Sequence, residues 1–277
     1  MINILTDSTA DLSREQCERL KIDTIPMYIQ VNGRVYKDGE EINAQELFDT
    51  VKKTGKYPTT SAPSPNDFIK FFTRKGKSIY LGVSSMLSTT MRNARLALQE
   101  IRDQQVEIID SLSISSGYGQ VVLKAAEWRN EGMGFEELTQ RIKKMVNKTR
   151  GVFILDHLDY LFHGGRCSAI QHFVSSLLNI RPFLKMCPDG TLGILRKVSG
   201  TRKKAVRTLM EYFKAQLSSH SIKHITLAHL DCDDEANFLR SEINNLGMNI
   251  EIASANVGCV LATHSGPNPL GIAYYVE

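Results

Sequence analysis

Short apolar segments alternate with helical segments along the first half of the chain, and this alternation limits the fold more than any other feature. A strand–helix–strand unit places its two strands in parallel and its helix on one face of the sheet. The pattern therefore predicts a parallel sheet with helices on both faces, and ligands of such sheets gather at the carboxyl ends of the strands. The expected strands are 2–5, 24–31, 78–83 and 106–109, and the expected helices are 13–20, 43–53, 65–74, 89–102 and 119–130.

Two of these helices begin with specific capping patterns. Asn43 stands three residues before Glu46, which resembles a capping box in which each side chain binds a free backbone N–H group. Ser64 precedes Pro65, and a serine N-cap with proline at the first helical position is typical of a helix start. We therefore expect helices to begin at both places.

The second half of the chain has a different order of elements. The turn signal at 188–190, Pro-Asp-Gly between two apolar segments, indicates an antiparallel hairpin. We expect an α/β protein of two domains, with residues 1–150 in the first and residues 151–277 in the second. Further helices are expected at 135–147, 169–178, 203–216 and 235–245, and further strands at 151–155, 181–187, 192–197, 225–230, 249–253 and 271–276.

Composition argues against several classes of protein. The net charge of +4, from 34 Lys and Arg against 30 Asp and Glu, is too weak to indicate binding to nucleic acid. The N-terminal segment lacks the basic and apolar regions of a signal peptide, and no run of about 18 apolar residues predicts a membrane helix. Five widely spaced cysteines without a CxxC pair are typical of reduced thiols. We therefore expect a cytoplasmic protein with no metal site and no stable insertion into a membrane.

Common motifs of nucleotide binding and hydrolysis are missing from the sequence. No GxxxxGK[ST] segment forms a P-loop, so we expect no ATP site in this chain. Neither the GxSxG motif of serine hydrolases nor the HExxH motif of zinc proteases occurs.

Hydroxyl side chains gather in four short segments that adjoin helices: 7–9, 59–61, 84–88 and 111–116. Helix capping explains any one of them, but several at the carboxyl edge of one sheet predict a site for an oxyanion. Ser88 stands before a helix whose first N–H groups lack internal partners, and such N–H groups attract anions. These groups bind by hydrogen bonds and do not by themselves perform catalysis.

Two cationic or titratable residues of the second half also stand next to glycines. Arg166 follows Gly164-Gly165, just past a helix end, and His264 lies in an expected glycine–proline loop at 263–267. A lone loop histidine is more often structural or exposed than functional. The apolar segments around both residues are explained first as ordinary core.

Seven segments in this order resemble the DegV family, the fatty-acid-binding subunits of the bacterial fatty acid kinase. The resemblance spans nearly the whole chain. The segments are TDSTADL at 6–12, TTSAPSP at 59–65, SSMLSTTMRNA at 84–94, LDYLFHGGR at 158–166, IRPFL at 180–184, DGTL at 189–192 and THSGPNPLGI at 263–272.

The resemblance implies a two-domain fold in which one long-chain fatty acid is enclosed. The N-terminal domain would be a parallel-sheet α/β/α domain with hydroxyl-rich head-group loops, and the C-terminal α/β domain, with a mixed sheet, would form much of the acyl-chain pocket. A partner kinase, similar to dihydroxyacetone kinases, would phosphorylate the bound carboxylate for phospholipid synthesis. The chain itself would then be a carrier with no cofactor, not an enzyme.

The family's functional residues carry over by motif. Thr60 and Ser88 resemble the hydroxyls that bind the carboxylate, and Ser61 is adjacent to the first. Arg166 resembles the arginine near the head group. His264 resembles the histidine that supports phosphotransfer by the partner.

Three positions depart from the family pattern. Thr89, in LSTTM, stands where the family usually has a glycine close to the ligand, and Asn268 stands where GPG is usual. Arg202 lies in a basic segment similar to one that contacts the kinase, although a solvated helix face explains that segment equally well. Gly200 stands about where the family often has an arginine.

Two other functions fit the same residues. An acyl hydrolase or transferase would use Ser88 as nucleophile and His264 as base, but no third residue in the sequence is an evident orienting group. A regulatory protein would bind lipid and respond to it without phosphorylation.

Overall fold

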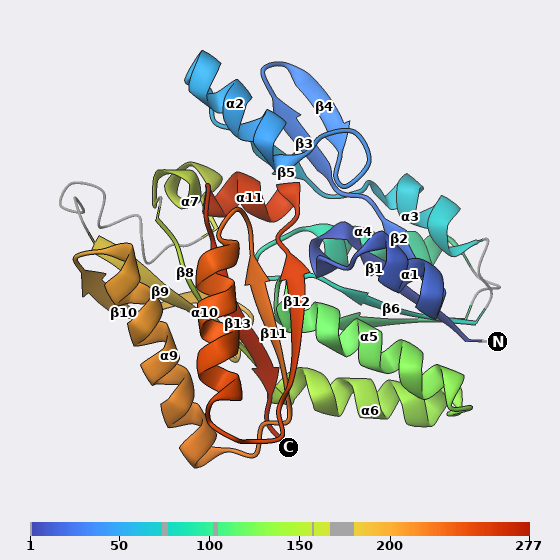
Figure 1. Ribbon diagram of the computed structural model, residues 1–277. Coiled ribbons are helices and arrows are strands. Elements are labelled where there is room, and N and C mark those ends of the chain that lie inside the picture. Colours follow the sequence, from blue (N-terminus) through green and yellow to red (C-terminus); the bar gives the residue numbers. More distant parts are fainter. Residues whose placement is uncertain (1, 74–76, 102–104, 157, 167–179) are drawn as a thin grey trace.

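The structure of the protein is a computed structural model (Figure 1). It describes residues 2–73, 77–101, 105–156, 158–166 and 180–277. The helix expected at 169–178 and Cys167 lie outside these residues.

The first half of the chain forms the expected parallel sheet, in the strand order β2-β1-β6-β7. Residues of α3 and α4 pack on one face of this sheet, and residues of α5 and α6 pack on the other. The prediction of a three-layered α/β/α arrangement is therefore confirmed (Figure 1). The elements are β1 (Asn3–Asp7), β2 (Ile22–Ile25), β6 (Ser78–Gly82), β7 (Val106–Asp110), α3 (Pro65–Phe72), α4 (Thr90–Glu100), α5 (Ser116–Asn130) and α6 (Phe135–Lys148).

The predicted helix starts are confirmed as well. The Asn43 side chain accepts a hydrogen bond from the Glu46 N–H and begins α2 (Ala44–Thr54), and the Glu46 carboxylate accepts from the Asn43 N–H. Ser64 forms the same kind of box with Asp67, before Pro65. A third box, from Ser13, begins α1 (Arg14–Leu20).

The strand expected at 24–31 is wrong in its extent, because the chain leaves the main sheet at Pro26. A proline has no N–H group to donate, so it interrupts a strand ladder. The residues after it form β3 (Tyr28–Val31), which pairs with β4 (Arg34–Lys37) and β5 (Thr59–Ser61) in a separate antiparallel sheet. Neither β4 nor β5 was predicted, and β5 carries two of the expected site residues.

The second half contains a mixed sheet of six strands in the order β10-β9-β8-β13-β11-β12. The expected hairpin is confirmed, because β9 and β10 pair in antiparallel register around the turn. Helices α9 and α10 cover one face of this sheet, and α5 contacts three of its strands from the other side (Figure 1). The elements are β8 (Thr149–Ile154), α7 (Leu158–Gly164), β9 (Ile180–Met186), β10 (Leu192–Ser199), α9 (Arg202–Ser219), β11 (His224–His229), α10 (Asp233–Asn244), β12 (Glu251–Asn256) and β13 (Leu270–Tyr275).

The expected loop around His264 is wrong: this residue lies in the last turn of a helix, α11 (Cys259–Ser265). The helix is only seven residues long and is bracketed by glycines, so the local pattern resembled a loop. Val260 and Ala262 of α11 belong to the same apolar cluster as the core of the first half. The division into residues 1–150 and 151–277 stays a prediction, because the C-terminal part of the chain contributes to both cores.

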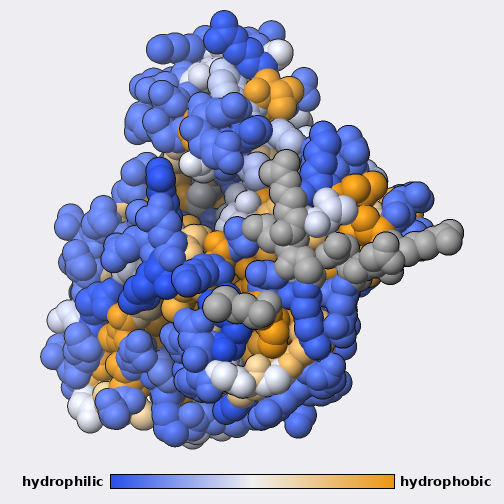
Figure 2. All heavy atoms as spheres, turned by 90° about the vertical axis from the view of Figure 1, so that its right-hand side faces the viewer, coloured by the Kyte–Doolittle hydropathy of each residue, from blue (hydrophilic) through white to orange (hydrophobic). Residues whose placement is uncertain are grey.

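Much of the surface seen from the side of the N-terminal sheet is hydrophilic, and apolar residues form separate patches there (Figure 2). Within the described residues, no helix combines the length and apolarity that a membrane crossing requires.

A fully buried carboxylate, that of Asp7, joins several of these elements. It accepts hydrogen bonds from the hydroxyls of Tyr118 (2.8 Å) and Tyr80 (3.0 Å), from the N–H of Val83 (3.0 Å), and from both the N–H and the hydroxyl of Thr9. The donors lie on β6, on α5 and in the segments after β1 and β6. Because hydrogen bonds satisfy both oxygens, the charge can stay buried without a cation beside it.

The variant Asp7→Asn should lower the free energy of unfolding by about 2–4 kcal/mol. Its amide NH₂ group cannot accept a hydrogen bond, so buried donors would lose their partner. Urea denaturation of both proteins measures the difference. Asp231→Asn is the matched control, because Asp231 is exposed and has a left-handed backbone that asparagine adopts readily. Equal midpoints for Asp7→Asn and the wild type would contradict this role.

Candidate ligand-binding site

Hydroxyl groups, one arginine and one histidine surround a cavity between the two halves, here called the polar cavity. No Asp or Glu side chain lines it among the residues that the structure describes. Hydrogen-bond donors without acidic neighbours suit an anionic group. Its polar lining residues are Thr9, Thr60, Ser61, Ser88, Thr89, Arg166 and His264.

The hydroxyls reach this cavity from different elements. Thr60 and Ser61 lie on β5, where Thr60 pairs with Ile29 of β3. Ser88 lies in the loop after β6, directly before the first turn of α4, and its hydroxyl is 2.7 Å from that of Thr90. The N-terminus of α4 thus stands beside the Ser88 hydroxyl, and its free N–H groups add partial positive charge. The predicted oxyanion site is therefore assembled from a strand edge and a helix start.

His264 is held against Thr60 from across the cavity. Its Nε2 atom lies 2.9 Å from the Thr60 hydroxyl oxygen, although 204 residues separate the two in the chain. The other ring nitrogen, Nδ1, is buried and has no hydrogen-bond partner among the described residues. That nitrogen faces the backbone of Gly164, where an added Cβ atom would lie only 2.2 Å away. Gly164 is thus needed for the close approach of α7 and α11.

The buried position of His264 changes its acidity. Burial, together with the positive charge of Arg166, lowers the pKa of His264 from its ordinary 6.5 to about 4. The imidazole is therefore neutral at physiological pH. A neutral ring can exchange hydrogen-bond donor and acceptor roles with Thr60 without adding a second fixed charge to the cavity.

Arg166 brings a cation to the rim of the polar cavity. The residue before it, Gly165, has a φ of +65°, a left-handed conformation that ends α7 and redirects the chain. The guanidinium then donates to the Gly164 carbonyl at 2.5 Å and lies 3.5 Å from the Leu87 carbonyl. The expected head-group arginine therefore bridges the end of α7 and the loop that carries Ser88.

A second cavity, here called the apolar cavity, adjoins the first. Strands β8 and β13, helix α11 and the start of α5 with the segment before it supply most of its walls. Its empty space is about 690 Å³, including the part that opens to solvent. Five residues line both cavities, and they are Ile114, Leu161, Leu192, Leu261 and His264.

The four hydroxyl-rich segments of the sequence do not all meet at one place. Thr9, the 59–61 segment and Ser88 line the polar cavity. The segment 111–116 instead supplies Ser113, Ser115 and Ser116 to the wall of the apolar cavity. The sequence pattern could not separate these positions, because all four segments are short hydroxyl-rich stretches that adjoin helices.

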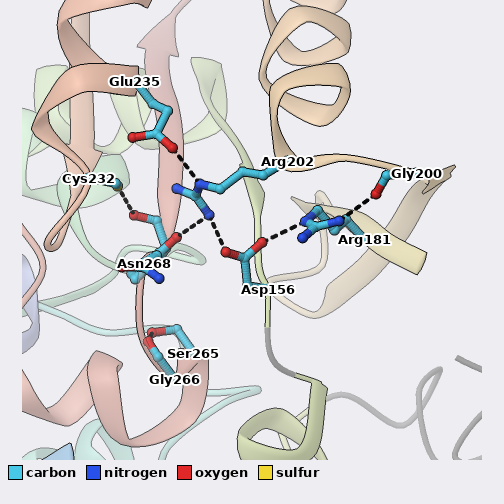
Figure 3. Close-up of polar contacts among 10 residues, drawn as sticks. Asp156, Arg181, Gly200, Arg202, Cys232, Glu235, Ser265, Gly266 and Asn268 are labelled. Carbon is cyan, nitrogen blue, oxygen red and sulfur yellow. Dashed lines mark hydrogen bonds and ion pairs between the residues drawn. The ribbon is translucent and has the colours of Figure 1, made fainter. Parts of the chain in front are cut away.

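Arg202 lies away from both cavities, in an ion-pair network (Figure 3). Its guanidinium donates to Asp156 and Glu235, each at 2.7 Å, and to the Asn268 carbonyl at 2.9 Å. Asp156 also accepts from Arg181 at 2.7 Å. Only 17% of the Arg202 side chain is exposed. Its assignment to a kinase contact stays a prediction, while its bonds within the chain give it a structural role.

Thr89 and Asn268, which depart from the family pattern, both lie in the described part of the structure. Thr89 lines the polar cavity as the N-cap of α4, but its side chain makes no capping bond and is exposed. Asn268 has a φ of +57°, and asparagine tolerates this left-handed conformation better than most residues other than glycine. Asn268 can therefore replace a glycine in this loop without a change of backbone path.

A hydrolase geometry is not assembled by these side chains. His264 Nε2 contacts Thr60, while the Ser88 hydroxyl contacts Thr90, so no base among the described residues lies in hydrogen-bond contact with the expected nucleophile. The bare Nδ1 atom also lacks an orienting group. No cluster of three His, Cys, Asp or Glu side chains suited to a metal ion is found in the described part of the chain.

The depressed pKa of His264 makes stability depend on pH. The unfolded chain binds a proton near pH 6.5 that the folded chain binds only near pH 4. The contribution of this group to the free energy of unfolding should therefore be fully present above about pH 6.5. It should fall by up to about 3 kcal/mol as the pH drops to about 4. Urea denaturation across this range should show a weaker pH dependence for His264→Gln. The exposed His220 gives the control variant, His220→Gln, and an identical slope in both variants would contradict the buried neutral ring.

Comparison with known proteins confirms the resemblance. A family model described as "Uncharacterised protein, DegV family" matches residues 1–277. A DegV domain-containing protein of Caldanaerobacter subterraneus is 31% identical over 277 residues, which cover 99% of this chain and 98% of that protein.

Two solved structures have the same fold. A DegV family protein from Thermus thermophilus, described by its fatty acid binding, matches with a TM-score of 0.90 and 31% identity over 100% of this chain and 99% of its own. DegV of Bacillus subtilis, described as a fatty acid binding protein, matches with a TM-score of 0.86 and 27% identity over 100% of this chain and 99% of its own. The family model covers the whole chain, and the fold agrees with that of solved DegV proteins. The protein therefore belongs to the DegV family.

Proposed function

We propose that the protein binds one long-chain fatty acid and presents its carboxylate to a partner kinase that resembles dihydroxyacetone kinases, in the cytoplasm. The observation that carries this proposal is that the two cavities adjoin, since they share five lining residues. One end offers hydrogen-bond donors and the other offers apolar walls. A molecule with an anionic head and a long hydrocarbon tail matches both ends at once.

The polar cavity would hold the carboxylate. The hydroxyls of Thr60 and Ser88 and the N-terminus of α4 can donate hydrogen bonds, and Arg166 supplies the nearby cation. A carboxylate does not need direct contact with the Arg166 cation, since hydrogen bonds can satisfy most of its oxygen lone pairs. The related proteins of T. thermophilus and B. subtilis, both described by fatty acid binding, support the same ligand class.

The apolar cavity would hold the hydrocarbon chain. Each buried CH₂ group contributes about 0.8 kcal/mol, so a chain of about fourteen groups yields on the order of 10 kcal/mol before the costs of association. Such a ligand stays bound through purification when its pocket is dry and closely packed. The walls offer this environment, because Leu155, Leu270 and Ile272 are almost completely buried.

The neutral ring of His264 suits a role in phosphoryl transfer rather than in holding the carboxylate alone. Transfer from ATP brings a phosphoryl group, with its own negative charge, up to the carboxylate, and catalysis needs groups that interact more strongly at that stage. His264 lies beside Thr60 and can donate a hydrogen bond or accept a proton there. ATP would come with the kinase, since this chain has no P-loop motif.

One fatty acid per chain should be found by native mass spectrometry and lipid extraction of the purified protein. Gly151→Leu should then weaken binding of long acids by about 2–3 kcal/mol and spare shorter ones, because the new side chain displaces several CH₂ groups. Gly151 lines the apolar cavity, and an added Cβ atom would meet only Met186, at 3.9 Å. Gly134→Leu, at the N-cap of α6 where an added Cβ atom meets nothing within 4 Å, is the control. Protein without bound lipid that also fails to be stabilised by added fatty acid would refute the proposal.

Ser88→Ala and His264→Ala should separate binding from phosphoryl transfer. Loss of the Ser88 hydroxyl should weaken retention of the fatty acid by roughly 1–3 kcal/mol, because part of the carboxylate loses its donor. His264→Ala should keep the lipid and lose most acyl-phosphate formation with a cognate kinase and labelled ATP. An empty pocket in His264→Ala beside a full one in Ser88→Ala would reverse the assigned roles. Normal lipid binding without any acyl phosphate in the wild type would favour a lipid-responsive regulator.

A further inference from the structure

We propose that the start of α5 forms a second polar site inside the apolar cavity, which binds an oxygen atom carried along the acyl chain. The ligand class would then include hydroxy or oxo fatty acids. This inference rests on the proposed function, because it concerns the tail of the same ligand.

The first observation is the hydroxyl group of Ser113. Ser113 lines the apolar cavity and is only 4% exposed. Its backbone groups bond to Ser111 and Ser84, but its hydroxyl oxygen has no hydrogen-bond partner among the described residues. A buried polar group without a partner is destabilising, and few occur in folded proteins. This hydroxyl therefore lacks the acceptor or donor that it needs.

The second observation is the uncapped N-terminus of α5, a helix of 15 residues. Its N-cap residue, Ser115, has a φ of +55° and makes no side-chain capping bond. The Ser115 hydroxyl instead donates to Asp11 at 2.5 Å. Ser116, the first helical residue, is buried and lines the same cavity, and its N–H has no acceptor in the described part of the chain. This helix start therefore presents a free donor and the positive end of the helix dipole to the cavity.

The two groups lie close together in the first turn. A Cβ atom added to Gly117 would lie 2.3 Å from the Ser113 hydroxyl oxygen, so this oxygen stands directly against the backbone of α5. Ile114, between the serines, lines both cavities. The Ser115 N–H also donates at 3.0 Å to Thr9, another residue of the polar cavity. The second site therefore lies near the junction of the cavities. It would face the part of the acyl chain that is next to the carboxylate.

The donors define the chemistry of the ligand. Ser113 can donate or accept one hydrogen bond, and the Ser116 N–H can only donate. A hydroxyl or keto oxygen accepts from both, whereas a plain hydrocarbon leaves both unsatisfied. Among the described residues that line the apolar cavity there is no lysine or arginine, so a second carboxylate is not the favoured group. The favoured ligand is a fatty acid with one neutral oxygen in the half of its chain nearer to the head group.

The test is binding of a positional series to the delipidated full chain. Octadecanoic acid and its monohydroxy isomers, with the hydroxyl at successive carbons, compete against a fluorescent fatty acid. The affinity should pass through a maximum at one position in the half nearer to the carboxylate, roughly 3- to 10-fold above octadecanoic acid. Isomers hydroxylated further along the chain should bind more weakly than octadecanoic acid, because they bury a hydroxyl without a partner.

Two variants show whether Ser113 causes this maximum. In Ser113→Ala, the best isomer should lose its advantage over octadecanoic acid. Its affinity should fall to about that of the isomers hydroxylated at the adjacent carbons. Thr139→Val is the matched control, since Thr139 also has a buried hydroxyl without a partner but lies on α6 and lines neither cavity. It should leave the whole profile unchanged. Thermal unfolding without ligand confirms that both variants are folded.

The outcomes are distinguishable. If octadecanoic acid binds but no isomer exceeds it, the serines bind water only and this inference fails while the proposed function stands. A maximum that persists in Ser113→Ala overturns the inference as well. If no acid of the series binds, the proposed function fails together with it.

Discussion

The buried carboxylate of Asp7 is the interaction on which the ligand-binding region depends. It stands at the carboxyl end of the first strand and gathers donors from the loop after β6, from the turn at Thr9 and from Tyr118 on α5. Val83 belongs to the loop that carries Ser88, and Tyr118 lies on the helix that directly follows Ser113. A charge with this many fixed donors has few other positions of similar energy, so it holds the loops in one arrangement. The edge of the parallel sheet is thereby made rigid before any ligand enters.

Helix α11 is the second constraint, because it carries His264 to the junction of the cavities. Its first residues are held by carboxylates of the N-terminal half: the Gly258 N–H donates to Asp11 at 3.0 Å, and the Val260 N–H donates to Asp38 at 3.3 Å. The loop after it is held through the Asn268 carbonyl by Arg202. A short helix fixed at both ends can keep a neutral imidazole in a buried place, where hydration would otherwise favour its charged form.

The same arrangement links the network of Arg202 to the candidate site. Asp156 precedes α7, whose end carries Gly164 and Arg166, and it pairs with the arginine that holds the loop after His264. Both segments that enclose the histidine are therefore tied to one ion-pair network (Figure 3). Since breaking a largely buried pair leaves a charge without a partner, the network resists separate movement of these two segments. The site is thus assembled from both halves of the chain.

The sequence by itself determined the features that rest on neighbours in the chain. The alternation of elements in the first half, the capping boxes of Asn43 and Ser64, and the hairpin around 188–190 were all predictable, because each depends on contacts within a few residues. The motifs also named Thr60, Ser88, Arg166 and His264 as one group, and the structure brings these residues to one cavity. The order of the seven family segments in the chain is enough to identify the family.

Only the tertiary structure decided the rest, because the relevant partners lie far apart in the sequence. The strand at Thr60 forms by pairing with β3, His264 is helical because α11 packs into a distant core, and Arg202 is buried by acids from two other elements. The division of the serines between a polar and an apolar wall also depends on which cavity each loop faces. The local sequence shows which side chains can form hydrogen bonds. The packing of remote segments decides which of these polar groups remain without a partner inside the protein.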